Sequence, residues 1–176
     1  MVQTRSDAAM IRARTRSPED TKHLAASMAE QAQSGDLLLL VGDLGAGKTT
    51  FAQGFAAALG VSEPVTSPTF TLAREYHGRL LLHHLDVFRL DQISEVLDLG
   101  LPELLDSDGV ILIEWGDAIR QTLPNDYLEV ALTFIEGQPS PPDERTVVLT
   151  PVGPRWQARV DDLAAATEPW LEASSQ

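Results

Sequence analysis

The feature of this sequence that most constrains its fold is a glycine-rich turn between an aliphatic run and a helix. The run Leu37–Val41 is continuous, as expected for a strand with both faces covered. The turn Gly42–Thr49 reads GDLGAGKT and matches the pattern G-x-x-x-x-G-K-[ST]. The periodicity that follows predicts a helix from about residue 48 to residue 59. Strand, turn and helix in this order predict a nucleotide-binding unit of an α/β fold.

Each residue type in this turn has a physical task in binding a nucleotide. Glycines let the backbone point its N–H groups at phosphate oxygens, and the helix N-terminus adds a positive dipole end. Lys48 is expected to reach the β- and γ-phosphates, Thr49 to bind magnesium and Thr50 to reach the α-phosphate. The candidate nucleotide-binding residues of the turn are Gly42, Asp43, Leu44, Gly45, Ala46, Gly47, Lys48, Thr49 and Thr50. The alternative is a purely structural turn, but a chance match is expected in fewer than about 1% of such chains.

Two later apolar runs, Leu80–Asp86 and Val110–Glu114, each end in a carboxylate. A nucleotide-binding loop of this type needs a second carboxylate near magnesium, commonly at the end of a neighbouring strand. Either carboxylate could hold the metal while the other orients the attacking water, and the spacing leaves the assignment open. A solvated strand end or a helix cap is the alternative for each. Lys48, Asp86 and Glu114 are therefore the candidate catalytic residues.

The alternation of apolar runs and amphipathic segments predicts a P-loop NTPase-like three-layer α/β sandwich around a mainly parallel sheet. Ser17 is expected to cap a helix that ends at Gly35. The runs 127–134 and 145–149 predict further strands that form an antiparallel edge. The length of 176 residues indicates one domain. We expect residues 1–14 to form a disordered tail, 15–160 the P-loop domain and 161–176 a helical or disordered extension.

Composition and charge exclude several classes of protein. There are no cysteines, which excludes a disulfide framework, a thiolate nucleophile and cysteine-ligated metals. The net charge is −13, and because residues 1–16 carry +3, the remainder carries −16. So acidic a body repels phosphate backbones, and we expect a partner to hold any nucleic acid. The alternative is that the acidity only keeps the protein soluble. The longest aliphatic run is too short to span a bilayer, so we expect a cytoplasmic protein with no membrane association.

Other features are less specific. The segment Val65–Thr71 follows the P-loop helix, where nucleotide-sensing loops occur, although its pattern favours an ordinary turn. His83 and His84 should point to opposite faces of a strand and share no metal. Trp115 is expected to pack rather than to take part in chemistry. The acidic residues between positions 91 and 108 predict a solvated helical face or a docking surface for a basic partner. No [NT]-K-x-D motif follows the P-loop, which favours adenine over guanine.

Four segments together resemble the TsaE family, the small bacterial ATPase subunit of the machinery that makes threonylcarbamoyladenosine on tRNA. They are GDLGAGKTTF at Gly42–Phe51, V-x-SPTFTL at Val65–Leu72, HLDVFRL at His84–Leu90 and LIEW at Leu112–Trp115. Their order and spacing also match, and the resemblance covers roughly residues 15–150. The chain departs from the family pattern at Phe88, where tyrosine is usual, and at Gly116, where proline often occurs.

The resemblance implies ATP and magnesium as cofactors, with Thr49 and Glu114 binding the metal and Asp86 important for activity. It also implies nucleotide contacts from the segment before the first helix and from an arginine on a late strand, for which Ser17 and Arg145 are the nearest positions. The implied function is support of threonylcarbamoyl modification of the tRNA adenosine next to the anticodon. The implied partners are the TsaB and TsaD proteins, so this chain meets tRNA only indirectly.

Because no internal arginine finger is evident, we expect ATP hydrolysis to be slow in the isolated chain and faster with partners. Two alternatives remain at this point. One is a small-molecule kinase that transfers phosphate to an acceptor other than water. The other is an assembly factor that binds ATP without hydrolysing it.

Overall fold

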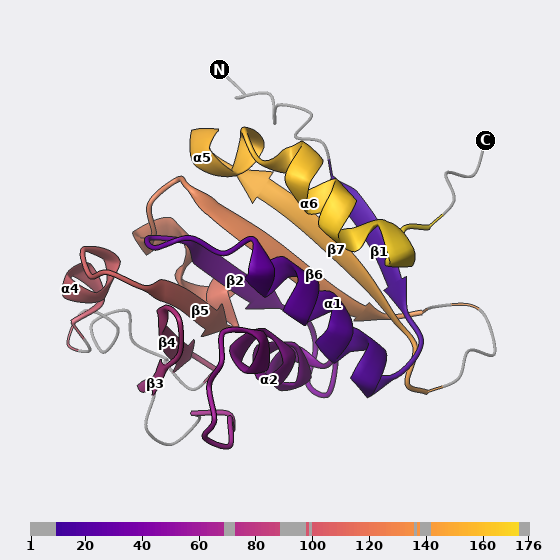
Figure 1. Cartoon of the computed structure of the whole chain (residues 1–176), viewed down its shortest axis with the longest axis horizontal. Helices are drawn as coiled ribbons and strands as arrows, with labels where there is room; N and C mark the ends of the chain where they lie inside the picture. Colours follow the sequence, from indigo (N-terminus) through magenta and orange to yellow (C-terminus); the bar gives the residue numbers. More distant parts are fainter. Residues whose placement is uncertain are drawn as a thin grey trace.

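The computed structural model describes residues 10–68, 73–88, 98, 100–135, 137 and 142–172, and within them it contains one seven-stranded sheet. The strands are β1 (Ile11–Thr15), β2 (Leu37–Val41), β3 (Ala73–His77), β4 (Leu81–Asp86), β5 (Val110–Glu114), β6 (Tyr127–Phe134) and β7 (Arg145–Val152). Their order across the sheet is β1-β7-β6-β2-β5-β4-β3 (Figure 1).

The four central strands β6, β2, β5 and β4 are parallel, whereas β1, β7 and β3 pair antiparallel with their neighbours. The prediction of a mainly parallel sheet with antiparallel edges is thus confirmed. In a parallel sheet the carboxyl ends of neighbouring strands meet at one edge, where ligands bind in many α/β proteins. Here that edge carries the end of β2 at Val41 and, in register on β4 and β5, the pair Asp86 and Glu114.

Helices cover both faces of the sheet. The described helical segments are α1 (Pro18–Glu30), α2 (Lys48–Ala58), α4 (Leu101–Leu105), η1 (Gly116–Thr122), α5 (Pro154–Gln157), α6 (Val160–Thr167) and η2 (Glu168–Trp170). One core cluster joins α1, α2 and α6 to the face that bears Leu38 and Leu40, and a second joins α4 and η1 to the face that bears Leu37 and Leu39. Figure 1 shows α1 and α2 lying in front of β2 and α6 running along β7 and β1. The continuous aliphatic run of β2 is explained, because both of its faces are buried.

The helices α1 and α2 pack closely because of two local sequence features. The Ser17 side chain accepts a hydrogen bond from the Asp20 amide at 3.0 Å and caps α1, as the sequence predicts. Gly54 of α2 faces the backbone of α1, where an added Cβ atom would lie 2.3 Å from the Lys22 carbonyl oxygen. Only glycine allows the two helices to approach this closely.

The prediction that residues 1–14 form a disordered tail is wrong for residues 11–14. Ile11–Thr15 form β1, which pairs antiparallel with β7. The side chains of Ile11, Ala13 and Thr15 are buried while those between them point outward, and this alternation is typical of an edge strand. Residues 1–9 lie outside the described part of the chain.

The C-terminal segment, which the sequence predicts as a helical or disordered extension, packs on the domain. Leu163 of α6 belongs to the core cluster that α1 and α2 share. Leu171 forms a bridge to Ala13, and the Glu172 amide donates to the Arg12 carbonyl at 3.2 Å. The free edge of β1 is therefore covered by the chain's own last described residues. No helix among the described residues is long and apolar enough to cross a membrane.

Candidate nucleotide-binding site

The glycine-rich turn connects the end of β2 to the start of α2 with a backbone that other residues would not adopt. Gly42 has φ 144°, and an added Cβ atom would lie 2.2 Å from the carbonyl oxygen of Leu132. Gly47 has φ 106° and is the N-cap of α2, whose first residue is Lys48. The turn therefore presents backbone N–H groups at the positive end of α2, at the carboxyl edge of the sheet.

The Lys48 side chain curls back over the turn. Its ammonium group donates to the carbonyl oxygens of Gly42 at 2.7 Å and Asp43 at 2.9 Å, and lies 3.7 Å from the centre of the Trp115 ring. Burial lowers the pKa of Lys48 below its ordinary value of 10.5, while the nearby charges of Glu114 and Asp86 act in the opposite direction. The carbonyl groups of Gly42 and Asp43 and the face of the Trp115 ring thus hold the ammonium group at the turn, in a position to bind phosphate.

The two residues predicted to hold magnesium lie together. The Thr49 hydroxyl donates to the Glu114 carboxylate, with Oγ1 at 3.0 Å from Oε1 and 3.1 Å from Oε2. Glu114 is 3% exposed and ends β5, the strand beside β2. A hydroxyl and a carboxylate are the hard oxygen donors that magnesium prefers, so this pair fits the ion.

Asp86 lies beside Glu114, at the paired position on β4. Its Oδ2 accepts a hydrogen bond from the Ser67 hydroxyl at 2.7 Å, and its Oδ1 accepts one from the Phe88 amide at 3.0 Å. The segment that starts at Val65 is therefore tied to the end of β4, next to the P-loop. Residues 69–72 of this segment, residues 89–90 of the HLDVFRL motif, and Asp91 and Glu95 of the acidic stretch lie outside the described residues.

A cavity of about 520 Å³ opens at this edge of the sheet. It is lined by Leu44, Gly45, Gly47, Lys48, Thr49, Thr50, Ser67, Asp86, Phe88, Glu114 and Trp115. The three candidate catalytic residues thus share one cavity with most of the predicted P-loop ligands. The lining contains no cysteine or histidine that would indicate a metal site rich in these residues. No group of three or more His, Asp or Glu side chains that could hold a metal occurs in the described part of the chain.

Sequence reasoning missed the aromatic rim of this cavity. Trp115 packs against the second core cluster, as the sequence predicts, and it also contacts Lys48 and the half-exposed ring of Phe88, whose centroid lies 4.6 Å away. Trp115 has φ 61°, a left-handed conformation rare for a bulky residue. This turn directly after the strand aims the indole at the P-loop, and strained backbone of this kind is concentrated at functional sites.

Gly42, Asp43 and Ala46 of the turn are not among the described residues that line the cavity, and neither are Ser17 and Arg145, the two predicted nucleotide ligands outside the turn. The Ser17 hydroxyl caps α1 instead. The guanidinium of Arg145 donates to the carbonyl oxygens of Ala46 at 3.0 Å and Gly45 at 3.2 Å, and lies over the ring of Phe134 at 4.4 Å. Arg145 therefore contacts the outer side of the P-loop backbone.

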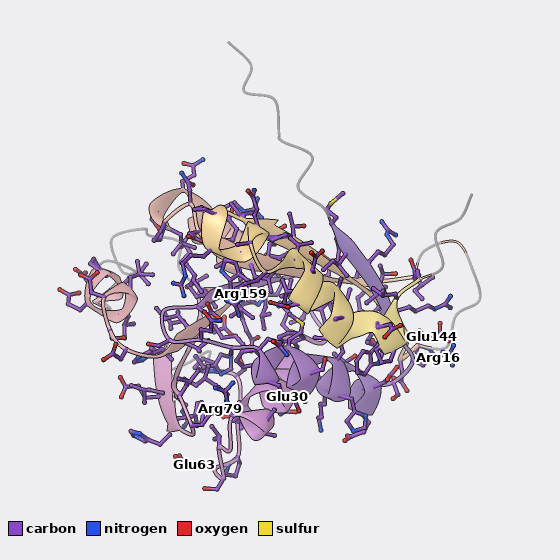
Figure 2. The ribbon with its side chains drawn as sticks, turned by 45° about the horizontal axis from the view of Figure 1, so that its top comes forward. Arg16, Glu30, Glu63, Arg79, Glu144 and Arg159 are labelled. Carbon is purple, nitrogen blue, oxygen red and sulfur yellow. The ribbon has the colours of Figure 1, made fainter. Side chains whose placement is uncertain are left out.

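Ser17 and Arg145 nevertheless lie at the same side of the sheet as the P-loop, the side formed by the carboxyl ends of the parallel strands. The register of β1 and β7 pairs Thr15 with Arg145. Consistent with this register, Figure 2 shows Arg16 and Glu144 next to each other at one end of the molecule. The N-terminal segment before α1 is thus placed beside the start of β7.

Comparison with known proteins shows the family of this chain. The family profile described as "Threonylcarbamoyl adenosine biosynthesis protein TsaE" matches residues 15–141. The chain belongs to the TsaE family. It is 44% identical over 152 residues to the tRNA threonylcarbamoyladenosine biosynthesis protein TsaE of Bacillus subtilis, covering 86% of this chain and 92% of that relative. The protein of the same name from Treponema pallidum is 40% identical over 125 residues, covering 71% and 93%.

A solved structure has a similar fold. The crystal structure of Bacillus subtilis YdiB superimposes with a TM-score of 0.75 at 39% identity, covering 89% of this chain and 95% of that one. The matched TsaE region includes the P-loop, Asp86 and Glu114 but ends before Arg145.

Proposed function

We propose that this chain binds ATP with magnesium, hydrolyses it slowly, and in this way supports synthesis of threonylcarbamoyladenosine on tRNA. The observation that carries the proposal is the contact between the Thr49 hydroxyl and the Glu114 carboxylate, directly beside Lys48, in a chain of the TsaE family. This contact joins the end of one strand to the first turn of the P-loop helix, where a phosphate-bound cation is expected.

The P-loop supplies the binding energy for the phosphates. The N–H groups of residues 45–49 and the N-terminus of α2 attract anionic oxygens. When phosphate arrives, the Lys48 ammonium exchanges the carbonyls of Gly42 and Asp43 for phosphate oxygens, which are stronger, charged acceptors. Because Lys48 is 4% exposed, this interaction takes place largely shielded from water.

Thr49 and Glu114 are the residues that would hold magnesium, which would supply positive charge to the phosphates. In hydrolysis, the oxygen of a water molecule bonds to the γ-phosphorus as the bond from phosphorus to the ADP oxygen breaks. We assign to Asp86 the orientation of that water or the transmission of the nucleotide state to a partner. The hydrogen bonds from Ser67 and Phe88 hold its carboxylate at the wall of the cavity.

The proposed partners are the TsaB and TsaD proteins, in the cytoplasm, with tRNA held by the partners. The net charge of −13 supports this division, since an acidic protein is poorly suited to binding a polyanion by itself. The two arginines within β1 also form ion pairs, Arg14 with Glu144 and Arg12 with Glu172.

The test is phosphate release from ATP with magnesium, by the chain alone and with purified TsaB and TsaD, with Lys48→Ala as the control. We expect slow release by the chain alone, faster release with the partners, and none above background in the variant. Binding of ATP without release in any mixture would replace the proposal with a passive assembly factor. Transfer of the γ-phosphate to an added small molecule would replace it with a kinase.

A further inference from the structure

One buried side chain at the site has a contact that the proposed function does not use. His84 of β4 is 0% exposed, and its Nε2 lies 2.9 Å from Oε1 of Glu114. An ionised carboxylate can only accept, so Nε2 carries the hydrogen and donates it. Nδ1 of the same ring is buried and finds no hydrogen-bond partner among the residues that the structure describes.

This arrangement is costly for a residue that only fills space. Burying a polar nitrogen without a partner lowers stability, and an apolar side chain would avoid that loss. The ring lies on the face covered by α1 and α2, with the Tyr76 ring centroid 6.4 Å away, so an apolar residue would fit the surroundings. The hydrogen bond that His84 makes is to a carboxylate at the nucleotide site.

The preceding residue provides a matched comparison. His83 is 3% exposed, lies on the same strand and points to the opposite face, where its Nε2 lies 3.1 Å from the Ser107 hydroxyl. The two histidines thus share residue type, strand, depth and a buried Nδ1 without a hydrogen-bond partner among the described residues. They differ in the carboxylate that they face: Nδ1 of His83 lies 3.3 Å from Oε1 of the exposed Glu75, whereas His84 contacts Glu114 at the site.

We propose that His84 is a positioning residue for the metal-binding carboxylate of Glu114. Glu114 is held from two elements, by Thr49 at the start of α2 and by His84 on β4. The histidine holds Oε1, which restricts rotation of the carboxylate and keeps both of its oxygens within hydrogen-bond distance of the Thr49 hydroxyl. Partners of metal-binding carboxylates commonly tune metal affinity by about 10–100-fold. This inference rests on the proposed binding of magnesium and ATP.

The prediction is a selective loss of the metal's contribution to nucleotide binding. We define that contribution as the ratio of the dissociation constants for the non-hydrolysable analogue AMP-PNP measured with EDTA and with saturating magnesium. In His84→Leu the ratio should fall by about 10-fold or more, while the affinity in EDTA stays that of the wild type. In His83→Leu both quantities should remain unchanged.

A second pair of variants separates positioning from folding. The glutamine amide nitrogen lies close to where imidazole Nε2 lies, whereas the shorter asparagine amide does not reach it. His84→Gln should therefore keep most of the metal-dependent ratio and His84→Asn should lose it, although both substitutions introduce an amide of similar polarity. Thermal unfolding of every variant, measured in parallel, identifies any that do not fold, and the Gln/Asn comparison stands where the leucine variant fails.

The outcomes separate this inference from the function on which it rests. A wild-type ratio in His84→Leu or in His84→Asn, or an equal loss in His83→Leu, overturns the positioning role. ATP analogue binding that is indifferent to magnesium in the wild type overturns it too, while leaving nucleotide binding intact. A wild type that binds the analogue in neither condition overturns the proposed function and this inference together.

Discussion

Asp36 and Glu114 are buried carboxylates at opposite ends of the neighbouring parallel strands β2 and β5, and they have opposite environments. Asp36 immediately precedes β2 and accepts hydrogen bonds from Arg159 at 2.8 Å, from Arg155 at 3.4 Å and from the Gln33 amide at 2.9 Å. Glu114 ends the neighbouring strand β5 and accepts from Thr49 and His84. Two arginines of the same chain therefore neutralise the charge of Asp36, whereas Glu114 contacts a hydroxyl and an imidazole.

The difference separates a structural carboxylate from one kept for a ligand. Arg159 also donates to the Gln31 carbonyl and stacks on the Trp156 ring at 4.4 Å, so the Asp36 cluster connects α5 and α6 to the end of α1. In Figure 2, Arg159 lies between the C-terminal helices and the region of α1. At Glu114, Thr49 and His84 orient the carboxylate, and its negative charge remains to attract a cation. This comparison predicts that the two residues differ in what their substitution damages.

The largest expected effect is on stability, at Asp36. Asp36→Asn removes the negative charge and leaves Arg159 buried beside a neutral amide, which should lower the free energy of unfolding by about 3 kcal/mol. Nucleotide affinity should be unchanged, because the site lies at the other edge of the sheet. Urea denaturation and calorimetric titration with ATP measure the two quantities. A variant of wild-type stability would show that the cluster contributes little.

Glu114→Gln should show the reverse pattern. A neutral amide costs less to bury than a carboxylate, so the free energy of unfolding should stay the same or rise. The magnesium-dependent part of ATP affinity should fall by at least about 10-fold, because the amide oxygen carries no net charge for the ion. The same two measurements apply. Loss of stability as large as in Asp36→Asn would contradict the assignment of Glu114 to a ligand.

The lowered pKa of Lys48 predicts a pH effect at the site. Phosphate binding needs the protonated ammonium, so ATP affinity should begin to fall at a pH below 10.5, the ordinary lysine value. The stability of the free protein should change in the other direction. The folded state disfavours the buried cation, so the free energy of unfolding should rise as the pH increases from the lowered pKa toward 10.5. In Lys48→Arg, which stays charged, the alkaline fall in affinity should disappear. An affinity unchanged up to pH 10.5 would show that the lysine is not desolvated.

The smallest effect is expected at the outer arginine of the Asp36 cluster. The Arg155 side chain is 47% exposed and lies 3.4 Å from Asp36, whereas the Arg159 side chain is 12% exposed and lies at 2.8 Å. Arg155→Gln should lower the free energy of unfolding by less than about 1 kcal/mol. Arg159→Gln should lower it by more, and urea denaturation of the two variants checks the order. An equal or reversed order would mean that the shorter, more buried contact does not dominate.

The part of the fold around the P-loop could be predicted because its signals are local. The aliphatic runs that became β2, β4 and β5 need both faces covered, and the glycine pattern of the turn determines where a helix begins. The neighbouring positions of Asp86 and Glu114 follow from strand order, since the ends of parallel strands meet at one edge. The contact between Thr49 and Glu114 can then be predicted from the order of the strands alone.

The elements that sequence reasoning missed depend on partners far away in the chain. Strand β1 is short and rich in arginine, and it forms because β7 pairs with it and Leu171 covers its edge. The arginine partners of Asp36 lie 119 and 123 residues along the chain, and nothing near Asp36 in the sequence indicates them. Trp115 faces the cavity because of a left-handed backbone turn, which the apolar character of the residue does not reveal.

The most direct test of the central claim is calorimetric titration of the wild-type chain with AMP-PNP, with magnesium and with EDTA, beside Lys48→Ala of confirmed thermal stability. The predicted result is one binding site per chain, tighter with magnesium, and loss of about 100-fold in affinity in the variant, because a charged donor at the phosphates is removed. Absence of binding by the wild type, or equal binding by Lys48→Ala, would contradict the assignment of this cavity to ATP.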